Sequence, residues 1–305
     1  MIFVDILITG GAGFIGSSLV ERLSREKNNI TVVDNFHTGS EDNLRKFKNS
    51  IKIIKCSSGD CEKFEKSYDI LFHQGIYSSS PMYKENPLLT ARCIEDFLKL
   101  LEFARRYDIK IVWASTSSLY NGHDPPHKES MQVKVTDHYT EARYAMERMA
   151  ELYNKLYGLS IIALRYFSVY GPNELSKKQY ANLVTQFLLA MKNNEQPVIY
   201  GDGKQTRDFT YVTDVVEANI LAARANIKFG IYNVGNGKET SINDMIGIIN
   251  KKLAKAIKPK YIENKVTNYV ARTMADTKKA EKELGFRSKI SLEEGIQNLI
   301  DFYGN

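Results

Sequence analysis

The first half of the chain alternates short apolar runs with stretches of helical periodicity. Continuously apolar runs rich in β-branched residues occupy positions 4–9, 31–34, 51–55, 70–73, 109–114 and 160–165. Between them, apolar residues at helical spacing predict helices over about 14–26, 88–107 and 139–157. Strands without polar alternation are covered on both faces, which is typical of parallel sheets with helical crossovers. The pattern therefore predicts a doubly wound, Rossmann-type α/β fold.

The alternation loosens after about residue 167. A helix near 179–193, short strands around 198–200 and 231–234, and further helices follow. Ser241 is a candidate N-cap, and Ser291 with Glu294 has the spacing of a capping box before the last helix. We expect two domains that share a cleft, 1–166 and a smaller α/β domain at 167–305, with segments near 207–225 packing back on the first.

The composition is that of an ordinary globular protein. Of 305 residues, 43% are hydrophobic and 26% are charged, which excludes long disorder, collagen-like repeats and a disulfide scaffold. The net charge of +6 includes clustered lysines, such as Lys251, Lys252, Lys255 and Lys258 on one predicted helix. A solvated helix face explains such a cluster better than a nucleic-acid surface does. We therefore expect no nucleic-acid partner.

The cysteines and the apolar segments bear on the compartment. Cys56, Cys61 and Cys93 lack C-x-x-C spacing and a histidine-rich context, so we expect no metal site and a reducing, cytoplasmic location. The apolar N-terminus runs after about eight residues into glycines, which favours a buried strand over a leader peptide. Since no stretch approaches the ~20 apolar residues that span a bilayer, we expect no membrane association.

A glycine turn follows the first predicted strand. Gly10, Gly13 and Gly16 in TGGAGFIG have G-x-x-G-x-x-G spacing, and Phe14 and Ile15 between them begin the first helix. Glycine is needed where the backbone bends sharply, where it approaches a pyrophosphate, and where the helix packs on the strand. The helix N-terminus then supplies N–H donors and a favourable dipole. The spacing predicts a dinucleotide phosphate site; a turn that serves packing alone is the alternative.

An acidic residue ends the second predicted strand. Asp34 lies 18 positions after Gly16, where a carboxylate accepts hydrogen bonds from both ribose hydroxyls of NAD and repels the 2′-phosphate of NADP. Asn35, Thr38 and Gly39 follow in a loop suited to the adenosine. We therefore predict NAD as the cofactor, bound by these residues and the glycine turn.

With these features and the segments TSSLY, HYTEAR, LRYFSVYGP and YGDGKQTRDFTYVTD in view, the chain resembles the extended short-chain dehydrogenase/reductases. Within them it is most similar to the NAD-dependent sugar-nucleotide epimerases and dehydratases of the UDP-glucose 4-epimerase type. The resemblance covers nearly the whole chain, and the segment at 200–214 is highly specific. It implies NAD as the cofactor, a nucleotide sugar as the substrate, and a cofactor contact at Gly75.

The resemblance implies a catalytic tyrosine at Tyr139. The family has a lysine four residues later, whereas this chain has Arg143. The spacing puts both side chains on one helical face, so the cation can favour the phenolate, which acts as general base; both residues would also contact the cofactor. The exchange is not conservative, because arginine is a longer planar fork. A packing role for Tyr139 is the alternative.

A hydroxyl cluster replaces the acids of related enzymes. Thr116 matches the family residue that hydrogen-bonds the reacting hydroxyl. In sugar-nucleotide 4,6-dehydratases the next two positions are Asp and Glu, and decarboxylating relatives keep a Glu, but here they are Ser117 and Ser118. Serine has no acid or base strength near neutral pH. We therefore expect elimination and decarboxylation to be lost and epimerisation to survive.

The resemblance implies a substrate site drawn from several loops. Arg207 matches the arginine that clamps the nucleotide diphosphate. A salt bridge with the adjacent Asp208 is the alternative. The remaining matched substrate positions are Thr116, Ser117, Asn182, Leu183, Val198 and Tyr200.

The chain departs from the family mainly on the substrate side. Ser168 replaces an asparagine that usually touches the substrate phosphates, and Ser57 replaces an aspartate that helps to hold the adenine. Where the family has an arginine and an acid that grip the nucleotide, only Lys265 and Arg272 are near. We keep Ser168 and Arg272 as candidate substrate contacts.

Three functions remain open at this point. The preferred one is an NAD-dependent isomerase that epimerises a nucleoside-diphosphate sugar, with UDP-sugar 4-epimerisation through a transient 4-keto intermediate. A same-fold enzyme with another outcome, at another carbon or as a keto-sugar reductase, is the second. A catalytically weakened NAD- or sugar-nucleotide-binding protein, suggested by Arg143, is the third.

Self-association is predicted from two helices. The segments 88–107 and 139–157 carry apolar residues over more than the one face that a helix needs to cover a sheet. Pairing them across a two-fold axis would bury the surplus, so we expect a homodimer.

Overall fold

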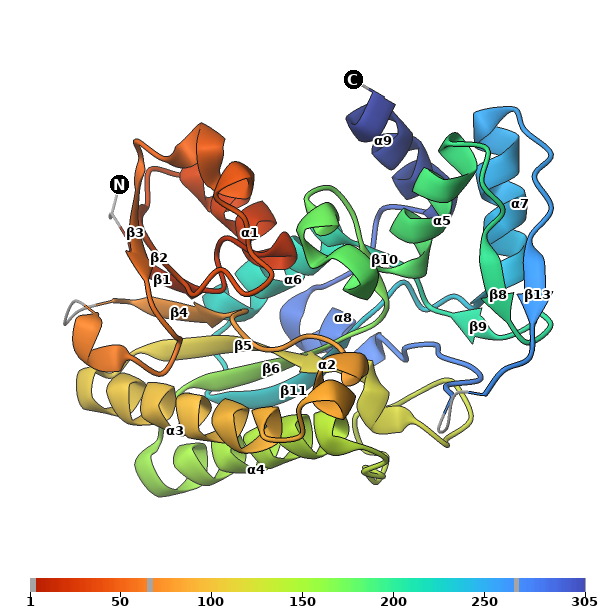
Figure 1. The fold of residues 1–305 in the computed structure, drawn as a ribbon. Helices are drawn as coiled ribbons and strands as arrows, with labels where there is room; N and C mark the ends of the chain where they lie inside the picture. Colours follow the sequence, from red (N-terminus) through yellow and green to blue (C-terminus); the bar gives the residue numbers. More distant parts are fainter. Residues whose placement is uncertain (1–3, 65–67, 266–268, 305) are drawn as a thin grey trace.

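A computed structural model describes residues 4–64, 68–265 and 269–304. Its centre is a seven-stranded, all-parallel sheet in the order β11-β6-β5-β4-β1-β2-β3 (Figure 1). The strands are β1 (Asp5–Thr9), β2 (Asn29–Asp34), β3 (Ile51–Lys55), β4 (Ile70–His73), β5 (Lys110–Thr116), β6 (Ile161–Tyr166) and β11 (Phe229–Val234). The order reverses between β1 and β4, and ligands of such sheets bind at that switch point.

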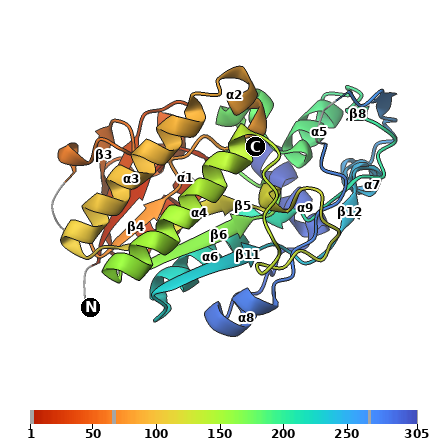
Figure 2. The same ribbon diagram turned by 90° about the horizontal axis from the view of Figure 1, so that it is seen from below.

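Helices cover both faces of the sheet, as the continuously apolar strands require. On one face lie α3 (Leu89–Tyr107) and α4 (His138–Tyr157), which run side by side in Figure 2. On the other lie α1 (Phe14–Ser24) and α6 (Val212–Arg224), which contact each other. The sequence expectation that segments near 207–225 pack against the first domain is therefore met by α6.

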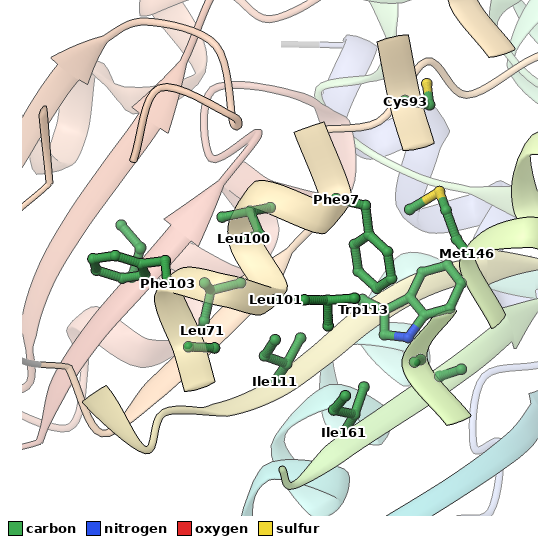
Figure 3. Close-up of a cluster of buried hydrophobic side chains, with 14 of the residues drawn as sticks. Leu71, Cys93, Phe97, Leu100, Leu101, Phe103, Ile111, Trp113, Met146 and Ile161 are labelled. Carbon is green, nitrogen blue, oxygen red and sulfur yellow. The ribbon is translucent and has the colours of Figure 1, made fainter. Parts of the chain in front are cut away.

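The core beneath α3 and α4 is aromatic and aliphatic. Trp113 of β5 is fully buried and its ring lies 4.9 Å from that of Phe97 on α3 (Figure 3). Met146 of α4 and Ile111 and Leu101 complete the same cluster. Burying side chains of this size contributes about 1.5–3 kcal/mol each. This packing holds α4, the helix that carries the predicted catalytic tyrosine, firmly against the sheet.

A smaller region lies beyond the carboxyl ends of the strands, at the right of Figure 1. Its own apolar cluster joins α5 (Leu183–Lys192), α7 (Ile242–Leu253) and α9 (Leu292–Gly304). The remaining helices and strands are α2 (Ser80–Glu85), β7 (Val169–Tyr170), β8 (Val198–Tyr200), β9 (Thr206–Arg207), β10 (Thr210–Tyr211), β12 (Thr240–Ser241), β13 (Lys260–Ile262) and α8 (Lys278–Leu284). Short 3₁₀ helices occur at Glu41–Phe47, Cys61–Lys63, Ser117–Tyr120 and Glu174–Tyr180.

Two sequence expectations need correction. The strand predicted at 231–234 was placed in the second domain, but β11 pairs in parallel with β6 and is the seventh strand of the central sheet. The helix predicted near 179–193 begins only at Leu183, because Lys178 has a non-helical backbone and the Asn182 side chain caps the helix by accepting from Val184 N. The division at residue 166 otherwise stays a prediction.

Both predicted serines cap their helices, and at Ser291 one of the two bonds of the expected capping box is present. The Ser241 side chain accepts a hydrogen bond from Asp244 N at the start of α7. At the start of α9, Ser291 Oγ accepts from Glu294 N at 3.2 Å. Each of these bonds satisfies one of the backbone N–H groups that a helix start leaves open.

Candidate active site

The glycine turn joins the carboxyl ends of β1 and β4. Gly10 has a left-handed backbone (φ +71°), and a Cβ there would overlap the backbone of Gly75, which follows β4. A Cβ at Gly16 would overlap the Gly10 carbonyl oxygen. Helix α1 starts at Phe14 with Gly13 as N-cap and no side-chain cap, so its first turn is open to an anion. This backbone arrangement fits the pyrophosphate of a dinucleotide.

A cavity of about 70 Å³ lies beside this turn and is lined by the residues predicted to bind the adenosine. Asp34 is 7% exposed there; its Oδ2 accepts from Ala12 N at 2.9 Å and its Oδ1 from Phe36 N at 2.7 Å. Burial raises the pKa of Asp34, and the backbone donors oppose that shift. The Ala12 and Phe36 N–H groups hold the carboxylate at the cavity wall, where it can accept from a ribose hydroxyl. Lining this cavity with Asp34 are Asn35, Thr38, Gly39 and Gly75.

A carboxylate that the sequence did not single out lies at the same end. Asp96 of α3 lines the cavity and accepts from Ser57 Oγ at 2.9 Å. A Cβ at Gly59 would overlap the Asp96 carboxylate, so glycine permits this approach. Asp96 therefore brings an acid next to Ser57, the position where the resembling family has an aspartate. The sequence alone gave no indication of this contact, because Ser57 and Asp96 are 39 positions apart.

The predicted catalytic residues share a second, continuous cavity of about 340 Å³. Thr116 ends β5, and its Oγ1 accepts from Ser118 N at 3.1 Å. Tyr139 lies in the first turn of α4 and is 7% exposed. The predicted residues that line this cavity are Gly10, Gly13, Phe14, Ile15, Gly16, Thr38, Thr116, Ser117, Tyr139, Arg143, Ser168 and Asn182. The fold thus brings the catalytic set and the glycine turn together.

Arg143 is a buried cation against the ring of Tyr139. Its guanidinium carbon lies 5.0 Å from the ring centroid, and Nη2 donates to the Tyr77 carbonyl at 2.8 Å. Within the described residues no ion pair joins Arg143 to a carboxylate. Burial and then the Arg143 charge lower the pKa of His73 to about 3, so that imidazole is neutral at physiological pH. Among the described residues, Arg143 thus lies against an aromatic ring, the Tyr77 carbonyl and the Met146 sulfur, at 3.9 Å, and not beside a carboxylate.

A buried ion pair fixes α4 to the sheet one turn after Arg143. Glu147 receives Arg165 Nε at 2.9 Å and Nη2 at 2.6 Å, and it also accepts from Ser115 Oγ at 2.6 Å. Arg165 donates in turn to Tyr120 Oη at 2.7 Å. Because β5, β6 and α4 all contribute, this network sets the position of α4 relative to Thr116 and the cavity.

Five predicted substrate residues line neither cavity: Leu183, Val198, Tyr200, Arg207 and Arg272. Arg207 donates from Nη1 to Thr206 O at 2.7 Å and covers the Tyr269 ring at 5.5 Å. Arg272 is paired with Glu239 through two hydrogen bonds, at 2.9 and 2.7 Å. Their substrate roles stay predictions.

The alternative for Arg207, a salt bridge with Asp208, does not form. Asp208 is fully buried and accepts instead from the backbone N–H groups of Asn236, Gly237 and Ala275 at 2.7–2.9 Å. Burial raises the pKa of Asp208 to about 6, against these three donors. The carboxylate therefore ties three loops together and leaves the Arg207 guanidinium to other partners.

Sequence reasoning missed several residues of the larger cavity. These are Gln74, Ile76, Ser78, Ser79, Ser80, Ala114, Ser115, Tyr166, Val169, Lys177 and Tyr180. The serine run at 78–80 was visible as an unusual stretch of sequence. Lys177 carried no local signal, since it is one lysine in a polar loop.

Comparisons with known proteins agree with this geometry. The profile of the NAD dependent epimerase/dehydratase family matches residues 6–235. The chain belongs to this family. A putative UDP-glucose 4-epimerase of Methanocaldococcus jannaschii is 35% identical over 98% of this chain and 98% of that protein.

Two solved epimerases have the same fold over nearly the whole chain. The UDP-N-acetylglucosamine 4-epimerase from Methanobrevibacter ruminantium, in complex with UDP-N-acetylmuramic acid, superposes with a TM-score of 0.93 at 32% identity, covering 99% of each chain. The UDP-glucose 4-epimerase from Thermotoga maritima with UDP-glucose gives 0.91 at 30% identity, covering 98% of each. The predicted Rossmann-type fold and the NAD-dependent family are thereby confirmed.

Among the described residues, no three His, Cys, Asp or Glu side chains gather as a metal site would require. Across the same residues, none of the helices combines the length and apolarity that crossing a bilayer requires.

Proposed function

We propose that this member of the epimerase/dehydratase family is an isomerase that epimerises a nucleoside-diphosphate sugar at C4, with a UDP-sugar as substrate. The observation that carries the proposal is the pairing of Tyr139 with the buried Arg143 in one cavity with Thr116. Arg143 has no carboxylate partner among the described residues, so its positive charge lies against the Tyr139 ring without being neutralised. Arginine can therefore take the electrostatic part of the role that lysine has in the resembling enzymes.

The residues divide the proton chemistry as follows. Tyr139 takes the proton of the sugar 4-hydroxyl, and the Thr116 hydroxyl hydrogen-bonds the same oxygen and polarises it. Bound NAD supplies the chemistry of accepting a hydride and giving it back. The 4-keto sugar rotates inside the cavity so that its other face can accept the hydride. Tyr139 then returns the proton as the other epimer forms. Enclosure by the protein keeps water away from the keto intermediate.

The hydroxyl cluster argues against two related reactions. Ser117 and Ser118 occupy the positions where elimination and decarboxylation use acids, and both line the cavity. Neither hydroxyl has the acid or base strength near neutral pH that these reactions require. Epimerisation at C4 requires one base and the nicotinamide, which this site can provide.

The decisive experiment compares two tyrosines that each have an arginine four residues later. Purified protein is incubated with UDP-glucose and other UDP-sugars without added NAD, and the 4-epimer is measured by chromatography. We expect epimer from the wild type and a loss of at least about 10³-fold in kcat for Tyr139→Phe. Tyr144→Phe, whose ring is covered by Arg148 on the same helix, is the matched control and keeps its activity.

The proposal fails if no epimer forms across a panel of sugar nucleotides and no transient reduced-nicotinamide absorbance appears. It also fails if Tyr139→Phe and Tyr144→Phe lose activity equally. Formation of a reduced sugar with stoichiometric NADH consumption would instead support the keto-sugar reductase alternative.

We also propose the remaining sequence assignments for the substrate. Arg207 would bind the diphosphate, Val198 and Tyr200 the pyrimidine, and Leu183 would line the diphosphate after the smaller region moves toward the cavity. The exposed side chains of Val198 and Tyr200 on the β8–β13 ribbon support this, since they are open to a flat base.

A homodimer in the cytoplasm completes the proposal. Leu152, Leu156 and Tyr157 on the outer face of α4 are 42%, 61% and 52% exposed, a surplus that a second copy would cover. The three cysteines are free thiols, which suits a reducing compartment. Sedimentation should give a dimer for the wild type and a monomer for Leu156→Glu; a wild-type monomer would contradict the assembly.

A further inference from the structure

The candidate substrate site lacks obvious groups to hold a diphosphate. A nucleotide sugar carries two negative charges there, and such groups are usually bound by Arg or Lys. Ser168 is neutral, and Arg207 and Arg272 line neither cavity. Among the described residues that line the larger cavity, the cations are Arg143 and Lys177. Since Arg143 lies buried against Tyr139, Lys177 is the cation lining this cavity that is left for a phosphate, in addition to the contact proposed for Arg207 from outside it.

Lys177 lies where the glycine turn meets the substrate loop. Its Nζ is 5.6 Å from the ring centroid of Phe14, the first residue of α1. The same cavity wall includes Ser168, Tyr180 and Asn182. The Lys177 side chain is only 16% exposed, so the ammonium is directed into the cavity region and is not a freely solvated surface charge.

A fully buried carboxylate orients this ammonium. Glu174 Oε1 lies 3.2 Å from Lys177 Nζ. Glu174 also accepts from Asn182 N at 2.7 Å and from Thr185 Oγ1 at 2.6 Å, so its charge is shared among three donors. The ammonium has three N–H donors, and the bond to Glu174 uses one of them. The remaining two can reach an anionic ligand in the cavity.

We propose that Lys177 binds the diphosphate of the nucleotide sugar and supplies the positive charge that Ser168 does not. The inference rests on the proposed function and deepens it. NAD carries a diphosphate of the same chemistry, but the open N-terminus of α1 already serves that group. Asn182, a predicted substrate contact, donates its N–H to the same Glu174 oxygen that Lys177 contacts, which places Lys177 on the substrate side of the cavity.

The test uses Lys177→Met, which keeps the length of the side chain and removes its charge. UDP alone is titrated into NAD-loaded protein by calorimetry at two salt concentrations. We expect UDP to bind about 10- to 100-fold more weakly to the variant, with a smaller salt dependence. The KM for the UDP-sugar should rise by a similar factor while kcat stays within about threefold.

Lys178→Met is the matched control, because Lys178 is exposed and lines neither cavity. It should bind UDP like the wild type. Bound NAD per protomer, measured after denaturation, should be unchanged in both variants. A loss of NAD without a change in UDP affinity would overturn the assignment to the substrate, and so would UDP affinity within twofold of the wild type.

The failure of this inference is separable from failure of the proposed function. If the wild type forms epimer but Lys177→Met keeps its KM, only the role of Lys177 is wrong. If the wild type binds UDP through Lys177 but forms no epimer from any sugar nucleotide, the epimerase proposal is wrong and the diphosphate contact stands.

Discussion

The predicted cofactor end and the proposed substrate rim are built in different ways. By the substrate rim we mean the loops that carry Lys177, Arg207 and Arg272. The cofactor end consists of backbone at the carboxyl ends of neighbouring strands, with glycines where Cβ atoms would overlap and two carboxylates, Asp34 and Asp96. The substrate rim consists of side chains from separate loops, held by contacts such as Glu174 with Lys177 and Glu239 with Arg272. Apart from Asp96, the residues of the cofactor end can be recognised from their spacing in the sequence. Those of the substrate rim cannot, because the site depends on which loops the fold brings together.

The largest expected effect is on cofactor binding, and it comes from adding one methyl group to the glycine turn. In Gly16→Ala the new Cβ would overlap the Gly10 carbonyl oxygen, so the turn must open. We expect bound NAD to fall by at least about 100-fold, and epimerisation with it, because the backbone itself is the ligand. Bound NAD is measured by absorbance after denaturation, and circular dichroism checks that the variant is folded.

Gly247→Ala is the matched control for this change. Gly247 lies in α7, and a Cβ there would have no neighbour within 4 Å. Alanine in a helix interior is favoured over glycine by up to about 1 kcal/mol, so this variant should be slightly stabilised and fully active. Normal NAD content in Gly16→Ala would mean that the turn does not bind the pyrophosphate.

The second prediction concerns the cation beside Tyr139. Arg143→Met removes the charge but fills a similar volume, and we expect kcat to fall about 100-fold while bound NAD changes less. Arg143→Lys restores the charge but loses the planar fork that reaches the Tyr77 carbonyl, so it should recover most of the activity without exceeding the wild type. Assays with a UDP-sugar measure kcat for the wild type and the two variants and so rank their activities.

A different order would change the functional assignment. If Arg143→Lys were more active than the wild type by orders of magnitude, arginine would be an impairment, and the weakened binding protein would become the better description. Equal activity of Arg143→Met and the wild type would show that the cation has no part in the chemistry.

The difference between local spacing and contacts made by the fold also explains which features could be predicted from the sequence. The apolar runs placed β3 at Ile51–Lys55 and β4 at Ile70–His73, the observed bounds, because a short run rich in β-branched residues is a local signal for a strand. The glycine turn and Asp34 were found for the same local reason. The strand β11 was assigned to the wrong sheet, because its pairing with β6 joins segments far apart in the chain.

The rim could be predicted only by resemblance, and incompletely. Asp96 was missed because the fold, not the spacing, brings it near Ser57. Lys177 is only three residues from Glu174, but the sequence does not show that this segment lines the cavity. Arg207 and Arg272 were named from family motifs, but the spacing did not reveal that Arg272 is already paired with Glu239. Sequence thus locates a charge, and structure decides whether that charge is available.

The third prediction tests how the rim loops are held. Asp208→Asn leaves one acceptor oxygen for three backbone donors, so we expect a loss of about 2–3 kcal/mol in the free energy of unfolding at pH 5. Burial raises the pKa of Asp208 to about 6, above its usual 3.8, so the folded state binds this proton more tightly. The stability contributed by the carboxyl is therefore complete below about pH 4 and is lost as pH rises through 6.

Urea unfolding at pH 5 and pH 7.5 measures this effect. The difference between the wild type and Asp208→Asn should narrow at the higher pH, where the buried carboxylate is ionised. Asp301→Asn, on exposed α9 surface, is the control and should shift stability by less than about 0.5 kcal/mol at either pH. A gap that widens with pH would contradict the raised pKa of Asp208.

The smallest expected effect separates the two rim arginines. Arg272 is 52% exposed and its charge is balanced by Glu239, and exposed pairs of this kind contribute about 0–1 kcal/mol. Arg207 has no carboxylate partner among the described residues, and burial lowers its pKa, so its charge gains more from a phosphate. Arg272→Met should therefore change the KM for a UDP-sugar less than about threefold, while Arg207→Met should raise it more. The reverse order would mean that Glu239 releases Arg272 to the substrate, and that ion pairs at the rim are exchanged for ligand contacts on binding.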